Sequence, residues 1–118
     1  MIQGIGIDMV ELDRIEKAVE RNENFPKRIL TEEELTQFNN LKGHRRIEFL
    51  GGRFAAKEAY AKAVGTGIGK LSFQDISVQK SKEGAPVIRG AGGKIVHVSI
   101  SHTKYHAIAQ IIIESSSS

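Results

Sequence analysis

The chain has 118 residues, of which 40% are hydrophobic, and it carries a formal net charge of +3. This length fits one domain, and the composition is typical of a globular chain and not of a disordered one. The absence of cysteine excludes thiol catalysis, disulfides and thiolate-bound metals. Because a chain this short buries only a modest core, an enzyme of this size is expected to share its active site between subunits.

The composition also limits the expected cellular location and the expected classes of partner. No apolar run approaches membrane-spanning length, and the first residues lack the pattern of a signal peptide, so we expect a cytoplasmic protein without membrane contact. The sequence pI of about 9.3 favours partners that carry phosphate or carboxylate groups. With no tryptophan and only 6% aromatic residues, the chain lacks base-stacking side chains, so we expect no nucleic-acid partner.

The chain is predicted to begin with a short strand over residues 2–10, where apolar residues alternate with glycines. Gly4 and Gly6 have no side chains, so other backbone is expected to approach this strand closely. After the strand the apolar period becomes helical, and this first helix should end near residues 22–24, before Pro26 interrupts the pattern.

Two further helices are predicted in the first half of the chain. Thr31 followed by Glu34 is a capping-box pattern, so a short helix should start at Thr31. A longer helix is predicted over residues 44–64, because apolar residues recur there at helical spacing and glycines follow. Gly51 and Gly52 lie in the middle of this helix, where glycine is unfavourable, so they predict close packing against another element.

The second half of the chain is predicted to be rich in strands, because apolar and polar residues alternate there. These strands are expected around residues 76–78, 87–88, 95–101 and 105–113. The prediction is therefore an α+β fold, in which helices pack on a small, mainly antiparallel sheet. We expect one domain over residues 1–114 and a polar C-terminal tail over residues 115–118.

Two carboxylates are candidate metal ligands. Asp8 lies in an apolar strand, where a buried carboxylate needs a partner or a cation; alternatively it faces solvent or caps the next helix. Glu58 shares one helix face with Phe54 and Lys62 and should be partly buried; the alternative is an ordinary Glu–Lys surface pair. If Asp8 and Glu58 meet, they suit Mg²⁺, which prefers oxygen ligands, and Lys62 would face the same phosphate groups.

His102 is a candidate for binding phosphate or carrying a proton, because it stands at the end of a predicted strand. The alternative is a turn histidine that is bonded to backbone. His44, His97 and His106 show no metal-ligand spacing with it, so no zinc site is expected. The glycine-rich segment 65–70 follows a helix instead of preceding one, so we interpret it as a loop that shapes a pocket and not as a phosphate-binding loop.

Basic residues near the first helix form a candidate docking strip for an acidic helix of a partner. Arg14 and Arg21 lie on one side of this helix, and Arg28 follows shortly after it. Phe25, next to Pro26, would supply an exposed apolar anchor for the same partner. Acidic residues lie beside these arginines, so the alternative is an ordinary solvated face of mixed charge.

Four segments together carry a resemblance to a known family. They span residues 4–8, 49–59, 65–69 and 96–103. In their order and spacing, and in the total length of the chain, the sequence resembles the bacterial holo-[acyl-carrier-protein] synthases, the short branch of the 4′-phosphopantetheinyl transferase superfamily. The match covers nearly the whole chain, and its main departures are residues 90–94 and the serine tail.

The resemblance implies a Mg²⁺-dependent enzyme that moves the 4′-phosphopantetheine group of coenzyme A onto a serine of apo acyl carrier protein and releases adenosine 3′,5′-bisphosphate. It also implies an α+β fold and a homotrimer with active sites at the subunit interfaces. By this resemblance Asp8 and Glu58 hold Mg²⁺, and Glu58 takes the serine proton directly or through a metal-bound water. Lys62 and His102 hold the diphosphate and stabilise the charge of the leaving group.

The remaining expectations concern which residues contact coenzyme A and which contact the acyl carrier protein. The residues expected to contact coenzyme A are Lys62, Gly65, Ser101 and His102. The residues expected to meet the acyl carrier protein are Arg14, Arg21, Phe25 and Arg28. Two other functions remain open from the sequence: a non-enzymatic module that binds an acidic protein through the basic helix, and an RNA-binding domain suggested only by the high pI.

Overall fold

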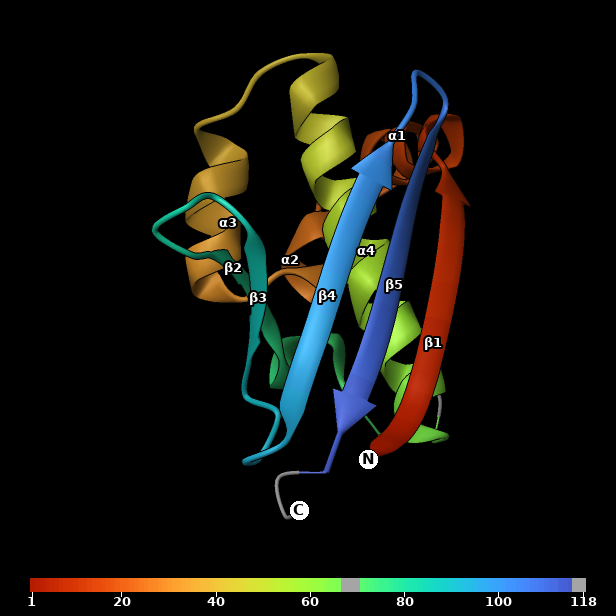
Figure 1. Ribbon diagram of the computed structural model, residues 1–118. Helices are drawn as coiled ribbons and strands as arrows, with labels where there is room; N and C mark the ends of the chain where they lie inside the picture. Colours follow the sequence, from red (N-terminus) through yellow and green to blue (C-terminus); the bar gives the residue numbers. More distant parts are fainter. Residues whose placement is uncertain (67–70, 116–118) are drawn as a thin grey trace.

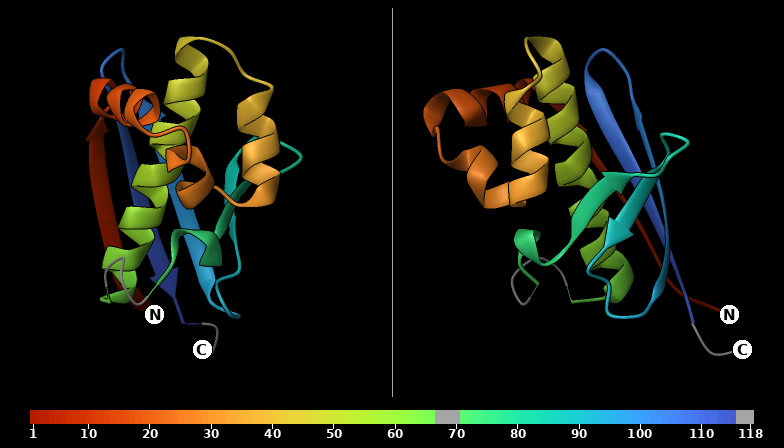
Figure 2. Two further views of the ribbon diagram at one scale, coloured as in Figure 1. Left: turned by 180° about the vertical axis from the view of Figure 1, so that it is seen from behind. Right: turned by 90° about the vertical axis from the view of Figure 1, so that its left-hand side faces the viewer.

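The computed structural model describes residues 1–66 and 71–115, which form two layers, with helices covering one face of an antiparallel sheet (Figures 1 and 2). Part of the predicted glycine-rich loop and most of the predicted serine tail, residues 67–70 and 116–118, lie outside the described residues. In the described ranges no helix is long and apolar enough to cross a lipid bilayer.

The main sheet consists of three antiparallel strands with β5 in the middle, in the order β1-β5-β4. These strands are β1 (Ile2–Glu11), β5 (His106–Glu114) and β4 (Ile95–His102). The register aligns Asp8 of β1 with Ala109 of β5. Because side chains alternate along a strand, the even-numbered residues of β1 and β4 face the helices, as their burial shows.

The long helix α4 (His44–Val64) has the predicted bounds and lies directly on β1. A Cβ atom added to Gly6 would lie 1.9 Å from the carbonyl oxygen of Ala59, and one added to Gly4 would lie 2.0 Å from that of Ala63. The predicted close approach of backbone to these glycines is therefore confirmed. The expectation of a short first strand was wrong, since β1 has 10 residues that pair along nearly all of β5.

Three shorter helices cover the first half of α4: α1 (Leu12–Arg21), α2 (Phe25–Ile29) and α3 (Glu32–Asn39). The predictions of α1 and α3 are confirmed, and α3 carries the predicted capping box at Thr31. Helix α2 was not predicted, because Pro26 was interpreted as an interruption. Pro26 instead stands in the first turn of α2, where its missing N–H group breaks no helical hydrogen bond.

A second, smaller sheet pairs β2 (Ser77–Lys80) with β3 (Pro86–Arg89). The sequence correctly predicted both strands, but not that they form a sheet of their own beside β4 (Figure 1). A 3-10 turn, η1 (Phe73–Asp75), precedes β2. The predicted α+β class, with helices packed on a small antiparallel sheet, is confirmed.

A fully buried ion pair joins α4 to α3 and β2. Lys57 and Glu34 each have a side-chain exposure of 0%, and the Lys57 Nζ atom lies 2.5 Å from Glu34 Oε1. Lys57 also donates to the carbonyl oxygen of Ile29, and Glu34 Oε2 accepts the N–H of Val78. Burial lowers the pKa of Lys57, and the charge of Glu34 opposes this shift. The pair therefore depends on both partners being present.

We predict that Glu34→Ala lowers the free energy of unfolding by about 3–5 kcal/mol, because it leaves the buried Lys57 ammonium unpaired. Urea unfolding followed by circular dichroism measures this change. Glu32→Ala is the matched control, since Glu32 lies exposed on the same helix and should change stability by less than about 1 kcal/mol. Equal effects of the two substitutions would contradict the importance of the buried pair.

Candidate functional site

Asp8 lies on the helix-facing side of β1, one step beyond Gly6, and meets a cation from the last turn of α4. The Lys62 Nζ atom donates to Asp8 Oδ1 at 2.9 Å and to the carbonyl oxygen of Ile7 at 3.1 Å. The Asp8 side chain is 15% exposed and that of Lys62 53%. Asp8 is thus a largely covered, paired carboxylate and not a solvent-facing or helix-capping residue.

Glu58 lies close enough to this pair for the charges to interact. Partial burial raises the pKa of the Glu58 carboxyl, the neighbouring charge of Asp8 raises it further, and Lys62 opposes the shift. Glu58 stands one helical turn before Lys62 on α4, and Lys62 donates a hydrogen bond to Asp8. The structure therefore brings Asp8, Glu58 and Lys62 into one neighbourhood. It pairs Lys62 with Asp8, which differs from the simple Glu58–Lys62 surface pair of the alternative interpretation.

This carboxylate cluster, defined as Asp8, Glu58 and Lys62, has the chemistry of a site that is completed by a ligand. Two carboxylates of like charge repel each other and favour a cation between them. Mg²⁺ commonly binds one or two protein carboxylates and takes its other oxygens from water and phosphate. Among the described residues, no three side chains of the metal-binding types gather to form an all-protein cage. The donor set therefore fits Mg²⁺ bound together with a phosphate compound.

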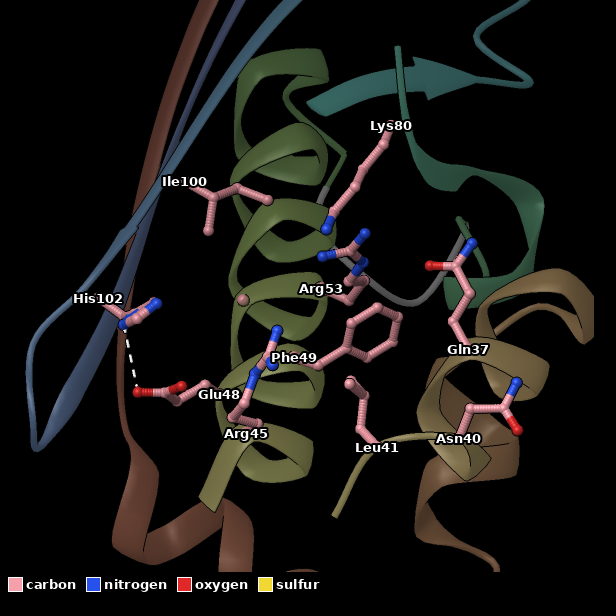
Figure 3. A pocket seen from close by; sticks show the side chains of 11 residues that line it. Gln37, Asn40, Leu41, Arg45, Glu48, Phe49, Arg53, Lys80, Ile100 and His102 are labelled. Atoms are coloured by element: carbon pink, nitrogen blue, oxygen red, sulfur yellow. Dashed lines mark ion pairs between the residues drawn. The ribbon is translucent and has the colours of Figure 1, made fainter. Parts of the chain in front are cut away.

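A second polar cluster surrounds His102 at the end of β4. His102 faces the helices, and its Nδ1 atom lies 3.3 Å from Glu48 Oε2 of α4 (Figure 3). Both residues line a cavity of about 500 Å³ between α4, α3 and β2. We call this cavity the His102 pocket. Its charged lining residues are Arg45, Glu48, Arg53, Lys80 and His102.

Arg53 is a largely buried arginine that lines the His102 pocket. Its guanidinium carbon lies 4.0 Å from the centre of the Phe49 ring, and its Nε atom lacks a hydrogen-bond partner in the described part of the chain. Among the described lining residues Arg45, Arg53 and Lys80 outnumber the one carboxylate, Glu48, so the pocket carries an excess of positive charge that favours an anion.

The two clusters lie on different sides of α4. Asp8 belongs to β1 and His102 to β4, and these are the two edge strands of the sheet, with β5 between them. Glu48 and Glu58 are ten residues apart, which corresponds to about 15 Å along a helix. One chain thus does not bring His102 to the carboxylate cluster. Nor does it bring Ser101 to His102, because neighbouring strand residues point to opposite faces and Ser101 is exposed on the outer one.

Gly65 is the other residue expected to contact coenzyme A. It ends α4 in the left-handed conformation, with φ of 90°, and its N–H group donates to the carbonyl oxygens of Ala61 and Lys62. Gly65 therefore holds the turn that follows Lys62, at the end of the helix nearest the carboxylate cluster.

Two of the predicted docking residues, Arg14 and Phe25, line an apolar groove. Arg14, Arg21 and Arg28 are exposed, whereas Phe25 is half-buried and its ring centre lies 6.2 Å from that of Phe54. The groove has a volume of about 370 Å³. Its lining residues are Met9, Val10, Glu11, Arg14, Ile15, Ala18, Phe25, Phe54 and His106. Phe54 stands one helical turn before Glu58, so the groove leads towards the carboxylate cluster.

Sequence reasoning missed most of the His102 pocket. A signal for part of it existed, because Arg45, Glu48 and Gly52 recur at spacings of three and four and share one side of α4. Arg53 and Lys80 carried no such signal, since charged residues are usually exposed and their convergence depends on how β2 packs.

Comparison with known proteins places the chain in a family. The profile of the 4′-phosphopantetheinyl transferase superfamily matches residues 4–112. The chain belongs to this superfamily. The resemblance stated from the sequence is therefore confirmed.

Full-length relatives of this superfamily are similar to the chain. It is 58% identical to a holo-[acyl-carrier-protein] synthase of a Geobacillus species and 52% identical to that of Oceanobacillus iheyensis, in both cases over 97% of this chain and 98% of the relative. A crystal structure of the Bacillus anthracis holo-(acyl-carrier-protein) synthase in complex with CoA (3′,5′-ADP) superposes with a TM-score of 0.93 at 56% identity, covering 98% of this chain and 99% of that chain. The Helicobacter pylori enzyme in complex with coenzyme A gives a TM-score of 0.83 at 37% identity, covering 93% and 99%.

We predict that Glu58→Gln raises the melting temperature in metal-free buffer at pH 8 by a few degrees, on the order of 2 °C. The pKa of Glu58 is raised in the folded state, so its ionised form opposes folding, and this penalty disappears as the carboxyl becomes protonated. The difference from wild type should therefore shrink as the pH falls towards 5. Thermal melts across this pH range measure it, with Glu16→Gln on α1 as the control. A variant that melts lower than wild type at pH 8 would contradict the repulsion between the two carboxylates.

Proposed function

We propose that this protein transfers the 4′-phosphopantetheine group from coenzyme A to a serine of apo acyl carrier protein. The observation that carries the proposal is the cluster of Asp8, Glu58 and Lys62, held together in a chain that is similar over its full length to holo-[acyl-carrier-protein] synthases. A non-enzymatic module that binds an acidic protein would have no use for two carboxylates held against each other. The catalytic domain would span residues 1–114, with 115–118 as a tail, and the enzyme would act in the cytoplasm.

In this proposal Asp8 and Glu58 hold Mg²⁺. When bound, Mg²⁺ neutralises the diphosphate of coenzyme A and polarises the phosphorus that is attacked. Lys62 is suited to contact the same diphosphate, because within the described part of the chain its ammonium group makes two hydrogen bonds, and its side chain is 53% exposed.

At phosphorus, the reaction forms one bond and breaks one. The serine oxygen of the carrier protein bonds to the phosphorus next to pantetheine, and the bond from that phosphorus to adenosine 3′,5′-bisphosphate breaks. The serine proton passes to Glu58, directly or through a water. Lys62 and His102 stabilise the charge on the departing phosphate.

Lys62 and His102 can serve one coenzyme A molecule only if two copies of the chain contribute. We propose a homotrimer in which the carboxylate cluster of one copy faces the His102 pocket of the next. A head-to-tail contact of this kind joins two different surfaces and closes into a ring. The outer face of β1 supports self-association, since Ile5, Ile7 and Met9 are 58–61% exposed and form one apolar row.

The acyl carrier protein would dock beside the carboxylate cluster. Arg14, Arg21 and Arg28 supply positive charge for an acidic helix, and the groove that contains Phe25 and Phe54 supplies an apolar surface. Because this groove leads to Glu58, a carrier bound there would present its serine to the cluster.

We predict that the purified protein, incubated with Mg²⁺, coenzyme A and apo acyl carrier protein, adds one phosphopantetheine group to the carrier. Mass spectrometry of the carrier detects the added group. Asp8→Asn should reduce the rate about 100-fold or more while the fold is retained, because it removes one of the two carboxylates. Asp13→Asn changes the same charge on the exposed face of α1 and should retain nearly full activity. Near wild-type activity of Asp8→Asn would remove the metal-site assignment.

A shared active site predicts complementation between two impaired variants. Asp8→Asn impairs the carboxylate side and His102→Ala impairs the pocket side, so one of the three interfaces in every mixed trimer would carry two intact halves, which is about one quarter of all interfaces after random assembly of equal amounts. Co-expression of the two chains should give a transfer rate well above that of either variant alone. A rate no higher than the average of the two variants would place each whole site within one chain.

Arg14→Glu should weaken the affinity for acyl carrier protein about tenfold at low salt, with little change in coenzyme A binding. The difference should shrink as ionic strength rises, because exposed charges are screened. Surface plasmon resonance with immobilised carrier measures the carrier affinity and its dependence on salt. Lys94→Glu, on the connection to β4, is the control. Unchanged carrier affinity would remove the docking strip from the proposal.

A further inference from the structure

The His102 pocket is rich in positive charge, yet it also contains a carboxylate. Arg45, Arg53 and Lys80 favour an anion, yet Glu48 is the one carboxylate among the described residues that line this cavity. A carboxylate in such a pocket repels phosphate unless its charge is used by a neighbouring group. The only side chains to which the structure pairs Glu48, within the described ranges, are two histidines.

The two histidines differ in their geometry. His102 places Nδ1 3.3 Å from Glu48 Oε2, whereas His44 places Nε2 3.7 Å from the same oxygen. His102 lines the pocket, and His44 does not. Both histidines therefore face one carboxylate oxygen of Glu48, and among the described residues no three side chains gather in a group suited to a metal ion.

The Glu48 side chain is less exposed than the His102 imidazole that it contacts. Its side chain is 21% exposed and stands on the long helix, whereas that of His102 is 50% exposed at the end of an edge strand. With Nδ1 turned towards Glu48, the Nε2 atom lies on the opposite side of the ring, away from the carboxylate (Figure 3). A ring held in this way can donate its Nδ1–H to Glu48 and its Nε2–H to an anion in the pocket.

We propose that Glu48 is a positioning residue for coenzyme A binding, which holds His102 so that Nε2–H donates to a phosphate oxygen. This inference rests on the proposed function for the identity of the ligand. It assigns to Glu48 an action through His102 and no contact with the substrate.

The experiment measures binding and ring geometry separately from catalysis. Isothermal titration calorimetry with coenzyme A and with adenosine 3′,5′-bisphosphate is applied to wild type, Glu48→Ala, Glu48→Gln, His102→Ala and the Glu48→Ala/His102→Ala double variant. Glu33→Gln is the matched control, because Glu33 is exposed on α3 and does not line the pocket. In parallel, ¹⁵N NMR of the His102 ring reports its protonation and hydrogen bonding without any ligand.

Glu48→Ala is expected to weaken binding of both ligands about tenfold, and the double variant should bind no more weakly than His102→Ala. Glu48→Gln, which keeps an acceptor oxygen, should retain most of the affinity, and the His102 ring signals should shift in Glu48→Ala but not in Glu33→Gln. Tighter or unchanged binding by Glu48→Ala, fully additive effects, or unshifted ring signals would each overturn the proposal.

The same data separate this inference from the proposed function. If wild type binds coenzyme A and shows the expected coupling but transfers nothing to the carrier, the positioning role of Glu48 stands and the proposed function fails. If transfer occurs and the coupling is absent, the proposed function stands and the positioning role fails. A wild type that binds neither ligand overturns both.

Discussion

The backbone of α4 touches the backbone of β1 at Gly6, and the carboxylate cluster depends on this contact. The position of a Cβ atom at Gly6 is already taken by the carbonyl oxygen of Ala59. Asp8 is the next residue of β1 on the same face, and Glu58 is the chain neighbour of Ala59. Any side chain at Gly6 would push the helix away from the strand and separate the two carboxylates. Gly6 is therefore important for the carboxylate cluster because it lets α4 and β1 approach each other closely.

The opposite side of α4 is held by a different interaction. Lys57 and Glu34 form a buried ion pair that connects α4 to α3 and β2, and a buried pair of this kind tolerates no loss of either partner. Glu58 follows Lys57 directly, so one residue anchors the helix and the next reaches the site. Because α4 is fixed on both sides, its two polar clusters keep their positions on different sides of one rigid element. This arrangement underlies the proposal that each chain supplies two halves of a shared site, which assembly of several copies would complete.

Local features of the sequence predicted several elements well. The bounds of α4 follow from an apolar helical period that ends at Gly65, and the start of α3 follows from the capping box at Thr31. The strands after residue 71 follow from alternation. The errors have local causes as well. Pro26 was interpreted as a break although a first helical turn accepts proline, and β1 was expected to be short because glycines weaken isolated strands. Glu34 was predicted only as part of the capping box, and its buried pair with Lys57 was not predicted, since the sequence does not show which distant charged residues meet.

Local patterns establish which residue types stand on which face of each element, because strand and helix periods are properties of neighbouring residues. That was enough to propose Asp8, Glu58, Lys62 and His102 as chemical groups. The folded chain was needed to show that Lys62 binds Asp8 beside Glu58, and that His102 lies elsewhere, in a pocket with Glu48 and Arg53. Contacts between segments far apart in the chain depend on how α4 packs against the sheet, and no local period encodes that packing.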